Sequence, residues 1–263
     1  MKIPKKTPPE QANSIDFIPG IHSVKEILLV CPSNIIELWI GQGKASPRAN
    51  EILNMANENG IPVLYKKSSV LDDILPGTSH QGIVALARGY TYIDGEDLIN
   101  SALKAPGHAL LIAADHITDE GNLGAMIRTA VFFGAHGLIL PKDRSAKITQ
   151  NVMKRSSGAY IHLPVTRVVN LVRILDNLDK RGLWIIGAAG ESTESIYQFD
   201  WQRDLVLVMG SEDKGLSPSV RNKCHQIVGI PATGLQESLN VSVAAGVILS
   251  EIIRQRHQTK SGK

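Results

Sequence analysis

The chain has 263 residues, a net charge of +3, and 43% hydrophobic against 20% charged residues. This globular composition excludes a collagen-like, coiled-coil or wholly disordered chain. The longest apolar runs, such as 109–114, are too short to span a bilayer, so we expect no membrane role. With no apolar signal core and only two, widely separated cysteines, we expect a reducing cytoplasm, no disulfide framework and no cysteine zinc site.

The first half of the chain predicts a tail and a small α/β unit. Residues 1–14 are basic and are expected to be an unfolded tail. Residues 15–89 alternate helical and strand patterns and form the expected first domain. Helices are predicted at 23–29, 49–58 and 70–75, and strands at 35–40, 63–65 and 82–87.

The second half predicts a larger α/β domain at 108–263, after a linker at 90–107 that contains a short helix at 94–104. Strands are predicted at 109–114, 137–140, 183–188, 205–209 and 226–230. Helices are predicted at 122–133, 146–157, 167–181, 216–223 and 238–256. Strands separated by helices predict a mostly parallel sheet with helices on both faces.

Several common site motifs are missing from the sequence. No G-x-G-x-x-G follows a strand, and Leu216 stands where a phosphate loop at 210–217 would need lysine. No nucleophile elbow is present. The eight histidines are scattered without metal-ligand spacing, so we interpret them as surface or structural residues and expect no metal site.

A polar loop at 115–121 leads from the predicted strand 109–114 into the helix 122–133. In an open α/β sheet, ligands bind beyond the carboxyl ends of strands, and a helix N-terminus attracts anions. Asn122 opens this helix, and Arg128 lies roughly one and two-thirds turns further on. These two residues are either an N-cap and a surface cation or members of a binding site.

Two further loops have the same position after a strand. At 206–216, glycines flank the acidic turn Glu212-Asp213, so a flat ligand can approach the backbone closely. At 230–246, a glycine-containing loop leads into a long helix, where Ser238 and Asn240 are either caps or site residues.

Together, the three segments read DxxxxxxNxGAxxRTAxxFG, GSExxGL and IPxxGxxxSLNVSxAA. Their order resembles the three motifs of the SpoU/TrmH branch of the SPOUT methyltransferases, over about residues 108–256. Segments 19–26 and 80–85 resemble the substrate-binding domain of many members, which is similar to ribosomal L30e-like RNA binders. The two-domain layout most resembles the 23S rRNA guanosine-2′-O-methyltransferases.

The sequence departs from the usual family pattern in two loops. Asp119-Glu120 stands where members often have Asp-Pro, and Gly121 precedes Asn122. Ala232 stands where the third motif often has methionine. These departures bear on loop shape and target nucleotide more than on the reaction.

The resemblance implies a C-terminal domain with a deep trefoil knot whose loops bind S-adenosylmethionine. It also implies a homodimer with its active site near the subunit interface. The adenine would be held mainly by backbone groups, and the positions that match are Gly210, Ile230, Leu239, Ala188 and Gly190.

The implied reaction is methyl transfer to a ribose 2′-hydroxyl of RNA, a guanosine of 23S rRNA. Arg128 would act as a base or orient the hydroxyl. A guanidinium keeps its proton up to about pH 12 and so is a poor base. We therefore favour a role for Arg128 in holding an RNA phosphate with two parallel donors. The other catalytic candidates are Asn122, Glu212, Ser238 and Asn240, with Glu212 either fixing Arg128 or binding the ribose.

Three other interpretations of the sequence stay open. A tRNA 2′-O-methyltransferase belongs to the same class. A non-catalytic RNA-binding protein that retains the fold has no need of these five polar residues. A small-molecule α/β enzyme fits less well with the basic N-terminal unit and the lack of other cofactor motifs.

Overall fold

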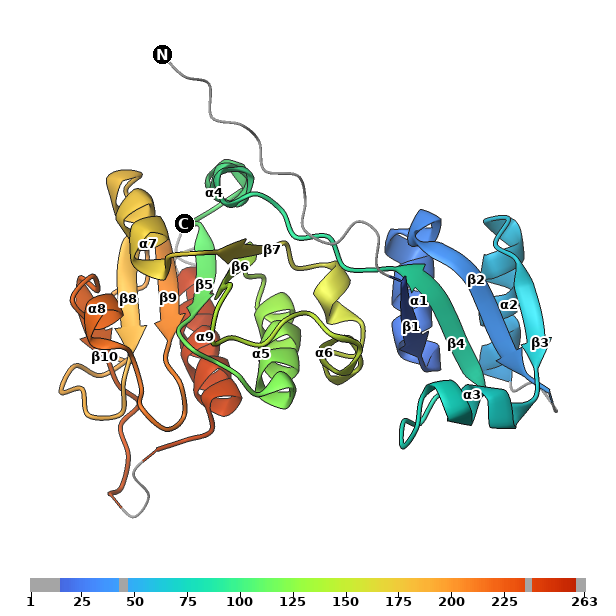
Figure 1. The fold of residues 1–263 in the computed structure, drawn as a ribbon. Coiled ribbons are helices and arrows are strands. Elements are labelled where there is room, and N and C mark those ends of the chain that lie inside the picture. Colours follow the sequence, from blue (N-terminus) through green and yellow to red (C-terminus); the bar gives the residue numbers. More distant parts are fainter. Residues whose placement is uncertain (1–14, 43–46, 235–237, 259–263) are drawn as a thin grey trace. The chain divides into compact units, whose positions relative to one another are not determined.

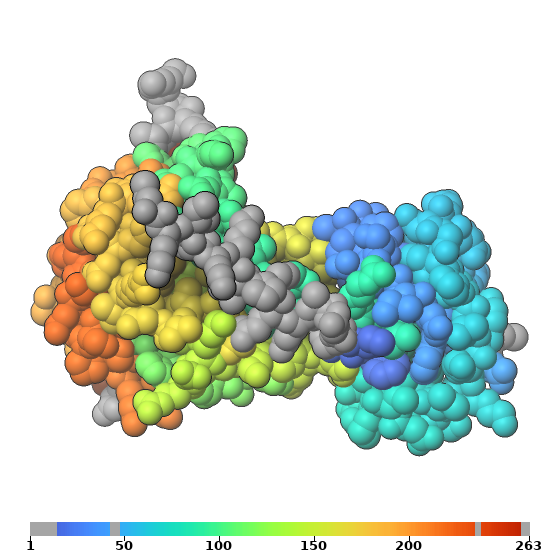
Figure 2. Space-filling view, turned by 45° about the horizontal axis from the view of Figure 1, so that its top comes forward, coloured from blue at the N-terminus to red at the C-terminus, as the bar shows by residue number. Residues whose placement is uncertain are grey.

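Figure 1 shows a computed structural model of the chain, which describes residues 15–42, 47–234 and 238–258. The tail predicted at 1–14 lies outside the described residues. The chain divides into two units, Met1–Asp94 and Gly95–Lys263. Each unit gathers as its own body in the space-filling view, the first coloured blue to teal and the second green to red (Figure 2).

The first unit is a four-stranded sheet in the order β1-β4-β2-β3, with β3 parallel to β2 and the other pairs antiparallel. Its strands are β1 (Ile15–Pro19), β2 (Ile35–Gly41), β3 (Val63–Lys66) and β4 (Ile83–Arg88). Its helices are α1 (Ile21–Val30), the 3-10 helix η1 (Pro32–Asn34), α2 (Pro47–Glu58) and α3 (Ser68–Ile74). The strand β1 was not predicted.

Pairing of β1 with β4 brings together the two segments that carried the resemblance of the first unit. Pro19 lies opposite Val84, and the Gly20 N–H donates to the Ile83 carbonyl at 3.0 Å. Gly20 has a φ of 93°, a conformation that favours glycine because it lacks a Cβ. Segments 19–26 and 80–85 therefore lie side by side.

The second unit is a six-stranded sheet in the order β10-β8-β9-β5-β6-β7, and every pair in it is parallel. The strands are β5 (Leu110–Ala114), β6 (Gly137–Pro141), β7 (Val165–Val168), β8 (Trp184–Ala188), β9 (Leu205–Met209) and β10 (Gln226–Val228). The predicted parallel sheet is confirmed. The edge strand β7 was not predicted, and part of it lies in the predicted helix 167–181.

Helices connect these strands. They are α4 (Gly95–Lys104), α5 (Glu120–Phe132), α6 (Gln150–Arg155), the 3-10 helix η2 (Ala159–Ile161), α7 (Leu171–Lys180), α8 (Pro218–Arg221) and α9 (Val241–Gln258). Helix α5 packs against α6 and α9, and α7 packs against β8 and α8 (Figure 1). Among the described residues, no helix combines the length and apolarity needed to cross a bilayer.

Helix α4, which lies within the predicted linker 90–107, packs against β6 and β7 of the second unit. The contact is close, because a Cβ on Gly137 would lie 2.2 Å from the Leu98 side chain. The helix predicted at 146–157 is also shorter than expected. Its first residues are held as a loop, in which the Ala146 N–H donates to the Ile117 carbonyl at 2.8 Å.

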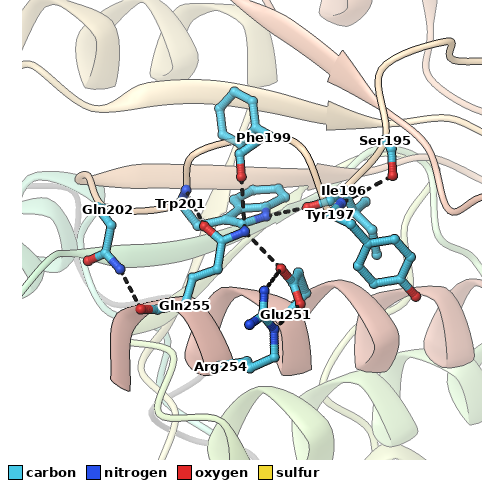
Figure 3. Close-up of polar contacts among 9 residues, drawn as sticks. All are labelled: Ser195, Ile196, Tyr197, Phe199, Trp201, Gln202, Glu251, Arg254 and Gln255. Carbon is cyan, nitrogen blue, oxygen red and sulfur yellow. Dashed lines mark hydrogen bonds and ion pairs between the residues drawn. The ribbon is translucent and has the colours of Figure 1, made fainter. Parts of the chain in front are cut away.

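A buried polar network fastens α9 to the segment between β8 and β9 (Figure 3). The fully buried Trp201 donates its indole N–H to the Ile196 carbonyl at 2.8 Å. The Gln255 side chain accepts from the Trp201 N–H at 3.1 Å and donates to Glu251 at 2.7 Å. The Arg254 guanidinium holds the buried Glu251 carboxylate with two bonds of 2.7 Å, which lowers the pKa of Glu251. The last turns of α9 are thereby tied to the segment between β8 and β9.

The chain returns from β10, at one edge of the sheet, to α9, which lies against α5 near the middle. A trefoil knot at this return stays a prediction of the family resemblance.

Candidate active site

The loop after β8 and two of the predicted loops begin side by side at the carboxyl ends of adjacent strands. Ala188, the last residue of β8, lies opposite Met209 of β9 and Val228 of β10. Gly190, Gly210 and Ile230 follow within two residues of these strand ends. Four of the five proposed adenine-binding positions therefore lie at the carboxyl ends of these strands.

The loop after β9 is a tight turn. The Ser211 N–H donates to the Gly215 carbonyl at 3.0 Å, and the Gly215 N–H donates back at 2.9 Å. A Cβ on Gly210 would lie 2.3 Å from the Gly215 carbonyl carbon, so only glycine fits there. Gly210 is thus required by the turn that presents Glu212.

Three of the predicted polar residues meet although each comes from a different motif. The Asn240 side-chain amide donates to Asn122 Oδ1 at 2.8 Å and to the Glu212 carboxylate. The Glu212 carboxylate also accepts from the Val241 N–H at 3.2 Å. Asn122, Glu212 and Asn240 are called the polar trio below. The trio joins α5, the turn after β9 and the start of α9.

The caps of the two helices differ from each other. Asp119 is the N-cap of α5, because its carboxylate accepts from the Asn122 N–H at 2.7 Å. Helix α5 begins at Glu120, two residues before the predicted start, so Asn122 is not its N-cap and its side chain is available to Asn240. Asn240 caps α9 by accepting from the Ser242 N–H at 3.0 Å while its amide serves the trio.

A buried carboxylate that sequence reasoning did not assign connects the first two loops. Asp115 is 1% exposed and accepts from the Ser217 N–H, 102 positions away, at 2.7 Å. Its other oxygen lies 2.6 Å from His116 Nδ1, and its own N–H donates to the Met209 carbonyl at 2.8 Å. The sequence did contain a sign of this site residue, because Asp115 directly follows a fully apolar strand.

Arg128 lies apart from the trio within this chain. Its side chain is exposed and donates to the Ser157 hydroxyl at 3.3 Å. Arg128 makes no contact with Glu212, one of the two partners expected for that carboxylate, because the carboxylate accepts from Asn240 and from the backbone of α9. The side of α5 that approaches α6 is close-packed, since a Cβ on Gly124 would lie 2.5 Å from Arg155 Cβ.

The remaining candidates precede α9. Ser238 is exposed, and Leu239 is 48% exposed, immediately before Asn240 of the trio. Elsewhere, burial raises the pKa of the Cys224 thiol to about 11, which keeps it protonated and unreactive. Within the described part of the chain, no three His, Cys, Asp or Glu side chains gather as a metal site.

With its parallel α/β domain, its polar trio and a small α/β domain before them, the chain fits a class of RNA-modifying enzymes. The chain belongs to the SpoU rRNA methylase family, whose model matches residues 109–250. A second model, RNA 2′-O ribose methyltransferase substrate binding, matches residues 17–93.

Named relatives match nearly the whole chain. The 23S rRNA (guanosine-2′-O-)-methyltransferase RlmB of Pseudomonas putida is 39% identical over 93% of this chain and 98% of its own length. The enzyme of the same name from Pseudomonas aeruginosa is 40% identical over 90% and 95%. The SpoU methyltransferase AviRb of Streptomyces viridochromogenes, crystallised with S-adenosylmethionine, matches with a TM-score of 0.77 and 25% identity over 93% and 91%.

Proposed function

We propose that this protein transfers a methyl group from S-adenosylmethionine to the ribose 2′-hydroxyl of a guanosine in 23S rRNA. The observation that carries the proposal is the polar trio, in which residues of three distant motifs meet at the carboxyl ends of the strands. Similarity at about 40% identity to 23S rRNA guanosine methyltransferases supports the same substrate. A ribosomal RNA substrate places the reaction in the cytoplasm.

The residues at the strand ends fit S-adenosylmethionine. Ala188 and Ile230 are half-buried, Leu239 is partly exposed, and the glycines at 190 and 210 bring bare backbone to the same edge. Small and apolar side chains beside backbone donors and acceptors suit a purine ring. The bound sulfonium supplies a methyl group that is already activated, so the chain has to position the acceptor and its proton.

The polar trio is the group that we assign to the acceptor ribose. Glu212 carries the one carboxylate of the trio. It accepts a hydrogen bond from the 2′-hydroxyl, orients the oxygen lone pair and takes up the hydroxyl proton as the methyl group passes from the sulfonium, which becomes a neutral thioether. Asn240 holds that carboxylate and is itself held by Asn122, and both asparagines offer amide groups to the nucleotide. Ser238, two residues before Asn240, is a further contact to the nucleotide.

Arg128 is assigned to a phosphate beside the target ribose. A guanidinium keeps its charge at physiological pH and binds phosphate oxygens with two parallel donors. Its bond to Ser157 is a single contact of 3.3 Å on the surface, which a phosphate can replace at little cost. The literal base, the other option for Arg128, requires a neutral guanidinium and is disfavoured.

We further propose that the protein is a homodimer. Phe132 at the end of α5 is 81% exposed, and Val243 of the adjacent α9 is 51% exposed. Large apolar side chains left in water on two neighbouring helices are typical of an interface. Arg128 lies one helical turn before Phe132, so this contact would place it next to a second copy.

The test is methylation with isotopically labelled S-adenosylmethionine and the full chain. Unmodified 23S rRNA and total tRNA are the two substrates, followed by digestion to nucleosides and mass spectrometry. We expect 2′-O-methylguanosine from 23S rRNA alone. Label in tRNA would favour the tRNA enzyme. RNA binding without any transfer would favour a non-catalytic binder.

A further inference from the structure

A group of basic side chains near the first turn of α5 has no role in the function proposed so far. Segment 142–155 contains five Lys and Arg residues and one carboxylate, Asp143. Four of these cations have no hydrogen-bond or ion-pair partner among the described residues. They are called the basic strip, and its members are Arg144, Lys147, Lys154 and Arg155.

The basic strip is attached to the loop that opens the site. The Ala146 N–H donates to the carbonyl of the buried Ile117 at 2.8 Å. The Asn151 amide donates to the Glu120 carboxylate at 2.9 Å, which joins the first turns of α6 and α5. Strand β6, from which the strip continues, is the neighbour of β5 in the sheet. The strip therefore borders the first turn of α5, which carries Asn122.

Arg144 is held in a strained backbone conformation. Its φ is +52°, a region that side-chain-bearing residues seldom occupy. The following residues dock on the first loop and hold it there, since the Ser145 hydroxyl and the Ala146 N–H both donate to the Ile117 carbonyl. Strain of this kind persists where the surroundings enforce it and concentrates at functional sites. Its result here is an exposed guanidinium next to the loop of the site.

We propose that the basic strip binds the RNA phosphates that flank the target nucleotide. The inference rests on the proposed RNA substrate and adds the path of the strand across the second unit. A chain of unpaired cations with one carboxylate among them suits a polyanion. Arginine donors match phosphate oxygens in pairs. The basic strip extends along a loop and a helix, so it suits several consecutive phosphates of an RNA strand rather than a single phosphate.

The test uses the full chain and two matched double variants. Arg144→Gly with Lys147→Gln removes two charges from the strip and relieves the positive φ, so folding is not endangered. Arg173→Gln with Lys180→Gln removes two charges from exposed positions of α7, a helix that packs against β8 and α8. A third variant, Arg144→Lys, keeps the charge. RNA affinity is measured against salt concentration with a 23S rRNA transcript.

We expect the strip variant to bind RNA about tenfold more weakly near physiological salt, and its log–log salt slope to fall by about 1.5. The α7 variant should match the wild type, and Arg144→Lys should lie between. The affinity for S-adenosylmethionine should stay unchanged in all of them.

Unchanged RNA affinity and salt slope in the strip variant would refute phosphate binding by the basic strip, whether or not the wild type methylates RNA. Equal losses in the strip and α7 variants would overturn it too. A wild type that methylates no RNA while the strip variant still loses salt-dependent binding would refute the proposed function and support the strip.

Discussion

The two ends of the six-stranded sheet both carry polar side chains, but the partners of these side chains differ. At the carboxyl ends, Asn122, Glu212 and Asn240 bond to one another and remain accessible. At the amino ends, histidine and arginine side chains bond to backbone groups. Side chains occupied by the backbone fix the fold, whereas accessible side chains bonded to each other can exchange partners with a substrate.

Two histidines make the same kind of contact at the amino ends of the strands. The Leu110 N–H donates to His136 Nδ1 at 3.0 Å, and the Ile185 N–H donates to His225 Nδ1 at 2.8 Å. Each histidine precedes a strand and caps the neighbouring strand with its ring. The interpretation of these two histidines as structural residues is confirmed.

Arg256 joins the end of α9 to the same amino ends. Burial lowers the pKa of its guanidinium to about 10, although the nearby Asp204 carboxylate opposes this effect. It donates to four backbone carbonyls, those of His108, Ala109, Trp201 and Arg203. This arginine is therefore structural, in contrast to the exposed Arg128.

The largest effect is expected at Glu212. Glu212→Gln keeps an oxygen for the Val241 N–H but loses the charge that we assign to the ribose hydroxyl. Methylation should slow by about 10³-fold with little change in stability. The matched control is Asp213→Asn, which removes the same charge from the next exposed residue of the turn. Equal activity losses in the two variants would refute the special role of Glu212.

The amino ends should show the opposite behaviour, a loss of stability. Arg256→Met leaves four carbonyls without their donor and should lower the free energy of unfolding by about 3 kcal/mol in urea. Arg221→Ala, which breaks the exposed pair with Glu191, should cost less than about 1 kcal/mol. A similar cost for both variants would mean that Arg256 does not fasten the sheet.

Asp115 belongs to the carboxyl ends yet is buried like the residues of the amino ends. Asp115→Asn removes the charge and one acceptor oxygen, so the Ser217 N–H keeps its acceptor only if the amide NH2 turns to His116, whose ring must then accept instead of donate. We expect a loss of about 2 kcal/mol in stability together with weaker binding of S-adenosylmethionine. Asp119→Asn is the control, because asparagine caps a helix as well as aspartate does. Normal cofactor affinity in a destabilised Asp115→Asn protein would reduce Asp115 to a fold residue.

The smallest effect concerns pH. Burial, together with the charge of Arg256, lowers the pKa of His136, so the folded protein favours the neutral ring that accepts from Leu110. The unfolded chain binds the proton near pH 6.5, so this stability is present above that pH and is lost as the pH falls below it. Urea unfolding between pH 7.5 and 5 should show a steeper loss for the wild type than for His136→Gln. Parallel curves would contradict this assignment.

The sequence was informative about the sheet but less so about its edges. Apolar runs predicted β5, β6, β8 and β9, because a strand buried on both faces has a continuous apolar pattern, and a short apolar run predicted the edge strand β10. The edge strand β1 of the first sheet and the edge strand β7 of the second were missed. In β7, Arg167 and Val168 are only half-buried and fit a helix start equally well.

The site was predicted in part for a related reason. The family resemblance placed Asn122, Glu212 and Asn240 in one candidate site, and the structure joins them by hydrogen bonds. Local periodicity contains no information on contacts between distant segments, so the bond between Asp115 and Ser217 was not foreseen. The close packing of Gly124 against Arg155 was missed for the same reason.

The most direct test of the division between the two ends is a titration of the isotopically labelled protein with S-adenosylmethionine, followed by backbone amide NMR shifts. Shifts should concentrate at Gly190, Gly210 and Leu239, while the amides next to His136 and Arg256 stay in place. Shifts centred on the amino ends, with the carboxyl-end loops unchanged, would contradict the assignment of the site.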